Sequence, residues 1–268
     1  MKRTRLGKKY RLGHWQSIFY SFKAMEQIFR LMLESFAKYL RIDVHGIEHI
    51  PKRGKALIAP NHSGCSGLDA VMLVYLLQQK LPRIPRMLTL WTFFRVFPFF
   101  APVAQRMGLK PASTENGVTL LKKNNLVVCF PEGEKGSFKP TAKRYKLQDF
   151  KSGFIRMALV TGAPIVPCVI IGAEETNINL ATLKLRDKKK AHDTLIPIPF
   201  NVIPLPAKWD IWFFEPIDLS GYRQFADDKV KLKEIAQEIR ATMQAHVDSE
   251  LAKRKYVYIK NAPDQATA

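Results

Sequence analysis

Short apolar segments that alternate with helical segments constrain the fold of this chain more than any other feature. The predicted strands are Lys55–Pro60, Leu126–Phe130, Ile165–Ile171 and Asp210–Glu215. Helical spacing of apolar residues predicts helices over Asp69–Gln79, Ser113–Lys122, Phe154–Val160 and Asp227–Lys255. The alternation predicts an α/β fold: a single domain over residues 43–255, with a mixed, mostly parallel central sheet flanked by helices.

Residues 1–42 combine a basic leader with an amphipathic helix. The first eleven residues carry six lysines and arginines, and no acidic residue precedes Glu26. Apolar residues then recur at helical spacing from Trp15 to Leu40. Such a helix suits the headgroup region of an anionic bilayer, although a helix packed on the core of its own domain has the same pattern. We expect membrane docking, and we expect no signal peptide because no uninterrupted apolar core or cleavage site follows the leader.

The run from Met87 to Ala104 is the other candidate for membrane contact. Arg95 and Pro98 interrupt it, so it predicts partial burial in lipid or under the core and no transmembrane span. We therefore expect a peripheral membrane protein on the cytoplasmic side, docked through its N-terminal helix and residues 91–100. Residues 184–206 show no clear element and are either a surface excursion or a second membrane-facing loop, and residues 256–268 form a C-terminal tail.

The charge and the cysteines narrow the class of protein. With 43 Lys and Arg against 23 Asp and Glu, the formal charge of +20 favours an anionic partner. The basic residues are spread along the chain without a nucleic-acid reader motif, so we expect an anionic membrane surface and no nucleic acid, although a non-catalytic nucleic-acid binder remains an alternative. The three cysteines lie far apart, so neither a disulfide framework nor a metal site is expected.

One candidate catalytic pair follows the first predicted strand. His62 stands directly after the strand and Asp69 lies seven residues further on. A histidine acts as a general base near neutral pH when a carboxylate fixes its tautomer. A continuous helix would place the two residues roughly 10 Å apart, but Gly64 and Gly67 permit the loop to fold back. The alternative is a loop histidine near an aspartate that only caps a helix.

A candidate phosphate site follows the strand at Leu126. The turn from Phe130 to Gly136 contains two glycines, which expose backbone N–H groups, and Lys135 adds a positive charge. Lys151 opens the next predicted helix and adds a second cation. Each motif by itself is also compatible with a plain turn.

In combination, these motifs resemble the glycerophospholipid acyltransferase family. The shared segments, in family order, are Asn61-His62 with Asp69, Phe130-Pro-Glu-Gly133, Phe150-Lys-Ser-Gly153 and Ala163-Pro-Ile-Val-Pro167. The closest likeness is to the 1-acylglycerol-3-phosphate acyltransferases, and it runs from about Val44 to Leu251. The resemblance implies transfer of a fatty acyl group from acyl-CoA or acyl carrier protein to a lysophospholipid hydroxyl, with no further cofactor.

The resemblance also implies residue roles. By the family motif, His62 takes the proton from the acceptor hydroxyl and Asp69 orients His62. Glu132 and Gly133 shape the acceptor site. Lys135 stands where an arginine usually contacts the phosphate, and Lys151 assists it.

Two departures from the family pattern and two further alternatives remain open. Six residues separate His62 from Asp69 where the family has four, and Glu134-Lys135-Gly136 replaces the usual Thr-Arg-Ser. A lysine lacks the bidentate fork of arginine, and Glu134 brings a negative charge, which leaves room for an unusual acceptor. The alternatives are a thioesterase or transacylase that uses Cys65 as nucleophile, and a non-catalytic membrane scaffold.

Overall fold

The computed structural model describes residues 25–90, 101–106, 108–186 and 194–258. The basic leader, the first part of the predicted N-terminal helix, residues 91–100 and most of the predicted tail lie outside these ranges. Among the described residues, no helix is long and apolar enough to cross a bilayer.

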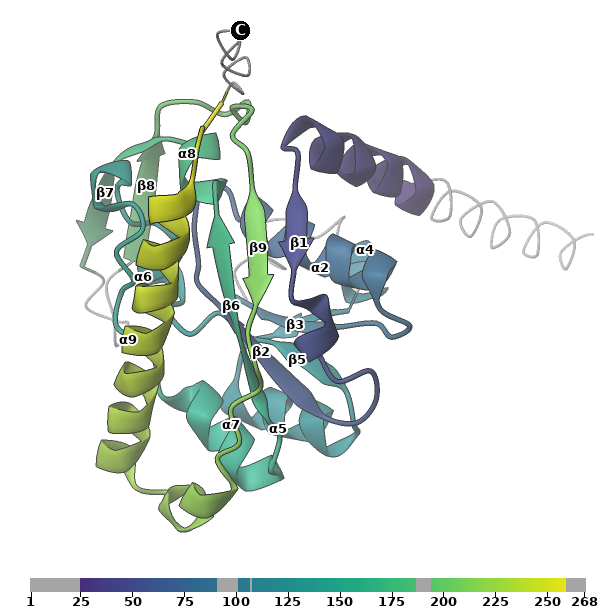
Figure 1. Ribbon diagram of the computed structural model, residues 1–268, viewed down its shortest axis with the longest axis vertical. Helices are drawn as coiled ribbons and strands as arrows, with labels where there is room; N and C mark the ends of the chain where they lie inside the picture. Colours follow the sequence, from purple (N-terminus) through teal and green to yellow (C-terminus); the bar gives the residue numbers. More distant parts are fainter. Residues whose placement is uncertain (1–24, 91–100, 107, 187–193, 259–268) are drawn as a thin grey trace, which may run out of the picture.

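A seven-stranded sheet forms the centre of the molecule (Figure 1). Its strands are β1 (Asp43–His45), β2 (Ala56–Pro60), β3 (Arg86–Thr89), β4 (Leu109–Pro111), β5 (Leu126–Val128), β6 (Ile165–Ile171) and β9 (Asp210–Phe213). Their spatial order is β1-β9-β6-β2-β5-β3-β4. The five strands from β6 to β4 run parallel, whereas β9 is antiparallel to β6 and parallel to β1. The expected mixed, mostly parallel sheet is confirmed.

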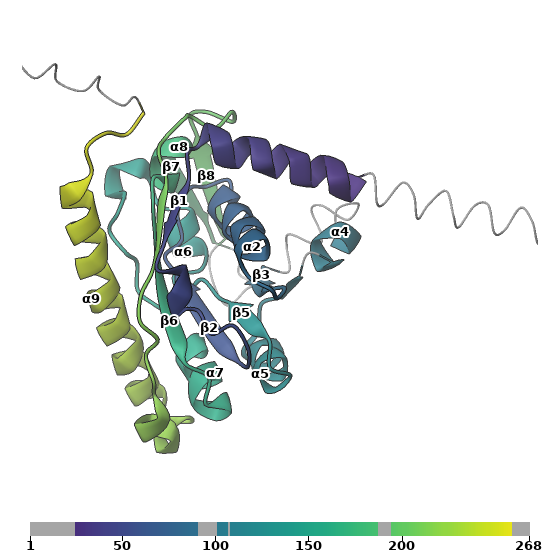
Figure 2. The same cartoon turned by 45° about the vertical axis from the view of Figure 1, so that its right-hand side comes forward.

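Helices cover both faces of this sheet (Figure 2). The N-terminal helix (residues 25–39), α2 (Leu68–Lys80) and α4 (Ala101–Arg106) pack on one face. The other face carries α5 (Thr114–Lys122), α7 (Gly153–Thr161) and α9 (Lys229–Lys253). A hydrophobic core lies on each face of the sheet. The side chains of β6 alternate between these two cores: Ile170 packs on the face that carries α2, and the adjacent side chain, Val169, packs on the face that carries α7. Both faces of the central strands are therefore buried, which explains why these strands are continuously apolar.

Side-chain caps fix where α5 and α9 begin. The Ser113 hydroxyl accepts the Asn116 N–H at the start of α5, and the Asp228 carboxylate accepts from Val230 and Lys231 at the start of α9. The shorter helices are α6 (Glu134–Ser137), α8 (Ala173–Thr176), η1 (Ile47–His49), η2 (Thr141–Lys143) and η3 (Ser220–Phe225).

Residues 184–206, for which no element is predicted, contain β8 (Thr194–Pro199) and the end of β7 (Asn179–Leu185), which form a second, two-stranded sheet. The two strands pair antiparallel. Pro197 and Pro199 lie in β8, and sequence patterns with proline do not predict a strand because proline has no N–H to donate to a neighbouring strand. A strand with only one neighbour has a free edge where proline is tolerated.

The N-terminal helix has one buried and one exposed apolar side. Leu33 is fully buried, and Phe29 and Phe36 pack against the core. Ile28 and Leu31 are 68% and 57% exposed on the other side. The helix therefore serves as a core element over the described residues and still presents apolar side chains to its surroundings.

Candidate active site

The sheet brings the two candidate motifs together at the carboxyl ends of neighbouring parallel strands. In the register of β2 and β5, Ile58 lies beside Val128. His62 follows the end of β2, and Glu132 follows the end of β5. Parallel neighbours deliver the segments after them to the same edge of a sheet, where open α/β folds place their ligands.

His62 and Asp69 are in direct contact. The Nδ1 atom of His62 lies 2.7 Å from Oδ2 of Asp69, and the same oxygen accepts the backbone N–H of Ser63 at 2.7 Å. The loop folds back because Gly64 and Gly67 adopt positive φ angles of 77° and 71°. Two residues more than in the family spacing are accommodated in this loop, which ends where α2 begins.

The environment of this pair suits proton transfer. Asp69 is 1% exposed, whereas the side chain of His62 retains 16% of its exposure. The carboxylate fixes the Nδ1–H tautomer and leaves Nε2 as the proton acceptor. Within the described part of the chain, no hydrogen bond occupies Nε2. The imidazole packs on the ring of Phe130, at 4.3 Å between centroids.

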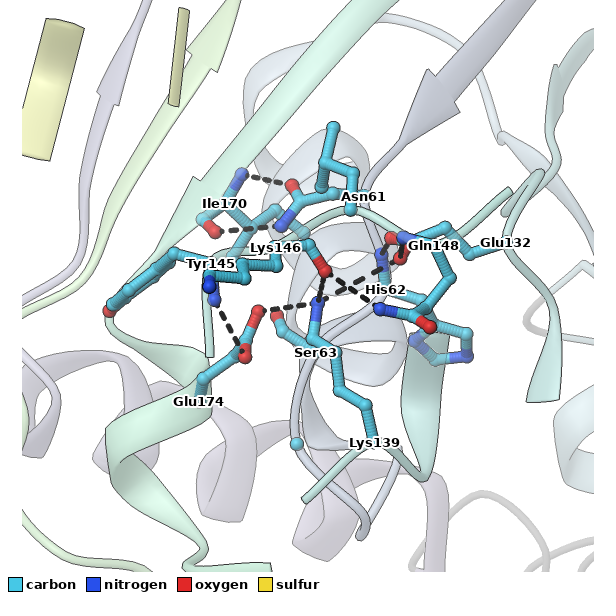
Figure 3. Close-up of polar contacts among 12 residues, drawn as sticks. Asn61, His62, Ser63, Glu132, Lys139, Tyr145, Lys146, Gln148, Ile170 and Glu174 are labelled. Atoms are coloured by element: carbon cyan, nitrogen blue, oxygen red, sulfur yellow. Dashed lines mark hydrogen bonds and ion pairs between the residues drawn. The ribbon is translucent and has the colours of Figure 1, made fainter. Parts of the chain in front are cut away.

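Asn61 anchors the end of β2 to β6. Its side chain donates to the carbonyl of Ile170 at 3.1 Å and accepts the N–H of Ile170 at 2.6 Å (Figure 3). The residue is fully buried. The backbone that carries His62 is thereby tied to the neighbouring strand.

Glu132 lies inside the protein and binds backbone. Its carboxylate has no exposed surface, and Oε1 accepts the N–H of His62 at 2.8 Å. The other oxygen, Oε2, accepts the N–H of Gln148 at 2.7 Å (Figure 3). Glu132 therefore links the loop after β2 to the segment before α7.

A buried ammonium and a second buried carboxylate lie behind Glu132. The Nζ atom of Lys139 is 3.7 Å from Oε2 of Glu132 and 2.9 Å from Oε1 of Glu174 (Figure 3). Glu174 also accepts the N–H of Tyr145 at 3.0 Å. Burial raises the pKa of Glu174 to about 7, against the opposing effect of Lys139.

Gly133 and Lys151 are also brought together. Gly133 has a φ of 57° and a ψ of −145°, a conformation that only glycine adopts readily. A Cβ atom at this position would lie 2.9 Å from Nζ of Lys151, so the lysine side chain extends across the glycine. Lys135, in α6, is exposed near the same turn. The arrangement presents two cations beside the Pro-Glu-Gly loop.

The cysteines lack the surroundings that activate a thiol. Burial raises the pKa of the Cys65 thiol, and it raises the pKa of Cys129 to about 12. Cys168 is buried in β6. Among the described residues, no hydrogen bond joins Cys65 to His62.

Three residues of this site have no assigned role in the sequence patterns: Asn61, Lys139 and Glu174. Asn61 stands next to His62 in the motif, and Glu174 lies in the Gly172-Ala-Glu-Glu175 segment of the resemblance. Lys139 carries no local signal, because a lysine in a basic chain is usually a surface residue. Only its contacts with two carboxylates distinguish it.

Comparisons with known proteins identify relatives of this chain. The Acyltransferase family matches residues 41–171. An uncharacterized protein of Mycobacterium tuberculosis is 36% identical over 243 residues, which cover 86% of this chain and 68% of the relative. A 1-acyl-sn-glycerol-3-phosphate acyltransferase of Limnanthes alba is 25% identical over 185 residues, covering 66% of this chain and 58% of that protein.

The fold is shared with a solved structure. The crystal structure of PlsC, the 1-acyl-sn-glycerophosphate acyltransferase of Thermotoga maritima, superposes with a TM-score of 0.53 at 17% identity, covering 91% of this chain and 90% of that one. With the family match and the mycobacterial similarity, these findings define the class: the chain belongs to the Acyltransferase family.

Proposed function

We propose that the protein transfers a fatty acyl group from an acyl thioester to the hydroxyl of a lysophospholipid, with 1-acylglycerol-3-phosphate as the representative acceptor. The observation that carries the proposal is the contact between Nδ1 of His62 and the buried carboxylate of Asp69 at the carboxyl edge of the sheet, where no described residue forms a hydrogen bond with Nε2. The family, and the acyltransferase activity for which the Limnanthes and Thermotoga proteins are named, support the same reaction class.

The proposed reaction is a direct transfer. His62 takes the proton from the acceptor hydroxyl through Nε2, and Asp69 stabilises the imidazolium that forms. The hydroxyl oxygen attacks the thioester carbonyl carbon and forms a tetrahedral oxyanion. Collapse of this species breaks the carbon–sulfur bond, and the thiolate of coenzyme A or of acyl carrier protein takes the proton from His62. The products are the ester and the free thiol.

Two cations support a phosphate-bearing acceptor. Lys151 lies across Gly133, and Lys135 is exposed in the helix that follows. We propose that both contact the phosphate and that Gly133 keeps the approach open. Glu132 has no exposed surface, so we propose that it shapes the acceptor site by holding the backbone.

We favour direct transfer over a covalent cysteine intermediate. Thiolate chemistry needs a lowered thiol pKa, whereas burial raises the pKa of Cys65. His62 already has a carboxylate partner and can act as a base toward the acceptor itself.

We also propose peripheral attachment to the cytoplasmic side of an anionic membrane. The N-terminal helix exposes Ile28 and Leu31, and the basic leader precedes it in the sequence. Such a helix binds the interface by apolar burial and by attraction to anionic lipids.

The test is acyl transfer from labelled acyl-CoA, and then from acyl carrier protein, to a panel of lysophospholipids. Wild type should form product and His62→Ala should not. The matched control is His246→Ala, because this histidine stacks on Phe214 outside the site. The absence of product from wild type with both donors, or equal turnover by His62→Ala, would contradict the proposal.

A further inference from the structure

The two-stranded sheet carries an apolar face that is exposed in the described part of the chain. In the register of β7 and β8, Leu183 pairs with Ile196 and Ala181 with Ile198, so these side chains share one face. Leu183 and Leu185 are 51% and 52% exposed, and Ile196 and Ile198 are 40% and 39% exposed. We call Leu183, Leu185, Ile196 and Ile198 the β7–β8 face.

Hydrogen bonds from β7 to the segment after α6 fix the position of this face. Thr182, which points to the other side of β7, donates its hydroxyl to the carbonyl of Phe138. Asn179 donates its side-chain amide to the same carbonyl at 2.8 Å, and its backbone N–H donates to Thr141 Oγ1 at 2.8 Å. The sheet is therefore attached to the segment directly after α6, and so to the Pro-Glu-Gly loop. Figure 1 shows β7 and β8 at the outer edge of the molecule, apart from the central sheet.

The exposed apolar residues continue beyond β8. Phe200, Val202 and Ile203 are 70%, 86% and 81% exposed in the connection to β9. This connection meets the N-terminal helix, because the hydroxyl of Tyr39 donates to the carbonyl of Pro204 at 2.9 Å. The apolar series thus leads from the β7–β8 face to the helix proposed above as a docking element.

The charged residues in the described segments beside this face are basic. The described segments 140–147, 178–186 and 194–206 contain no aspartate or glutamate. Their lysines and arginines are Lys143, Arg144, Lys146, Lys184 and Arg186, and all five are exposed. An anionic lipid surface can bind both the apolar side chains of the face and the basic side chains of these described segments.

We propose that the β7–β8 face inserts into the interfacial region of an anionic membrane and holds the Pro-Glu-Gly loop, the proposed acceptor site, at the lipid surface. This inference rests on the proposed function, because docking through this face would place the Pro-Glu-Gly loop at the membrane surface, where a lysophospholipid resides. Exposed apolar patches mark interaction sites. The five basic residues beside the face, and the net charge of +20 of the chain, favour lipid over a second copy of this chain, since like charges repel.

The consequence concerns substrate delivery. Phe138 and Thr141, which hold the sheet, follow α6 and its exposed Lys135. Lipid contact at the β7–β8 face therefore sets the height of the Pro-Glu-Gly loop relative to the headgroups. An acceptor then reaches the loop while its acyl chain stays in the membrane.

The test measures binding of the full chain to vesicles of phosphatidylcholine with and without 30% phosphatidylglycerol, by co-sedimentation. The variant is Leu183→Ser with Ile196→Ser, which removes one cross-strand pair from the face. The matched control is Ile84→Ser with Val230→Ser, two residues that are 52% and 70% exposed elsewhere. We expect about tenfold weaker binding of the face variant to the anionic vesicles and unchanged binding of the control.

A second measurement does not depend on the stability of the double variant. Tryptophan fluorescence of Leu183→Trp should be quenched by brominated lipids relative to wild type, and that of Val230→Trp should not. Unchanged vesicle binding by the face variant, or no added quenching at position 183, would overturn the proposal. Concentration-dependent dimers that the face variant abolishes, with vesicle binding intact, would assign the face to a second copy.

The two proposals fail separately, because vesicle binding requires no turnover. Binding should be the same for wild type and His62→Ala. Loss of the proposed reaction with intact binding through the β7–β8 face would refute the reaction alone. Normal transfer to acceptors in detergent micelles, with no role of the face in vesicle binding, would refute the docking alone.

Discussion

Oε1 of Glu132 accepts the backbone N–H of His62 at 2.8 Å, and this bond joins two motifs that lie 70 residues apart in the chain. The carboxylate is fully buried and its second oxygen accepts the N–H of Gln148. A glutamate held in this way fixes the backbone of the loop that carries the proposed base. The hydrogen bond thereby connects the Pro-Glu-Gly motif to the backbone of His62, the proposed base.

Replacement of Glu132 tests this link. In Glu132→Gln only one side-chain oxygen remains to accept a backbone N–H, and the new NH₂ group faces the other backbone N–H, which loses its acceptor. Lys139 also loses one of its two carboxylate partners. We expect kcat to fall at least about tenfold and the free energy of unfolding to fall by about 1–3 kcal/mol. Steady-state kinetics and chemical denaturation measure both.

The division between kcat and KM distinguishes positioning from direct substrate binding at Glu132. A positioning residue lowers kcat with little change in KM for the acceptor, whereas a substrate ligand raises KM. The control is Glu115→Gln, an exposed carboxylate in α5. An effect confined to KM would show that Glu132 contacts the acceptor after all.

Asp69→Asn tests the tautomer of His62. One oxygen of Asp69 accepts both from His62 Nδ1 and from the Ser63 N–H. An amide cannot stabilise the imidazolium, and it permits the tautomer that carries a proton on Nε2. We expect kcat to fall by about 10²–10⁴ with KM little changed.

The pH profile of kcat provides the second readout for Asp69, since the limb that reports the base should shift in Asp69→Asn. Asp227→Asn serves as the control, because Asp227 is an exposed partner of Arg156. Wild-type turnover by Asp69→Asn would refute the pairing as a catalytic feature.

Lys135 and Lys151 are expected to recognise a phosphate. Lys135→Gln and Lys151→Gln should each raise KM for 1-acylglycerol-3-phosphate by about tenfold, which corresponds to about 1.4 kcal/mol. KM for a monoacylglycerol, which lacks the phosphate, should change little. Kinetics with the two acceptors measure the difference, and Lys123→Gln, an exposed lysine after α5, is the control. Equal effects on both acceptors would place the phosphate elsewhere.

Glu174 predicts a specific dependence of stability on pH. Burial raises the pKa of this carboxyl from 4.5 to about 7 in the folded state. Between these values the folded protein binds more protons than the unfolded chain, so the contribution of Glu174 to stability decreases as pH rises. Above about pH 7 the loss is complete.

Glu174→Gln removes this titration. Wild type and variant should have similar free energies of unfolding at pH 4.5, and the variant should be more stable at pH 8 by on the order of 3 kcal/mol. Urea denaturation at the two pH values measures the difference. Parallel behaviour of the two proteins would show that Lys139 keeps Glu174 ionised throughout.

Local periodicity determined much of the fold. The apolar pattern defines β6 at Ile165–Ile171 without error, and it places α5 and α9 within two residues of their observed ends. A helix or strand that is buried against an adjacent layer has apolar residues at a regular spacing, and this spacing is visible in the local sequence. The strands β1, β3 and β4 are not among the predicted strands, and each contains a charged or polar residue that interrupts the apolar run. The ladder of β7 and β8 depends on a partner strand that propensity does not reveal.

The candidate site divides in the same way. Residue types and order, together with the family resemblance, were enough to predict the candidate site residues His62, Asp69, Glu132, Gly133, Lys135 and Lys151. The contact of His62 with Asp69 required the fold-back of the loop at Gly64 and Gly67. The burial of Glu132, and the presence of Lys139 and Glu174 behind it, were decided by tertiary structure alone. Hydrogen bonds between distant segments depend on which strands become neighbours, and no local pattern encodes that choice.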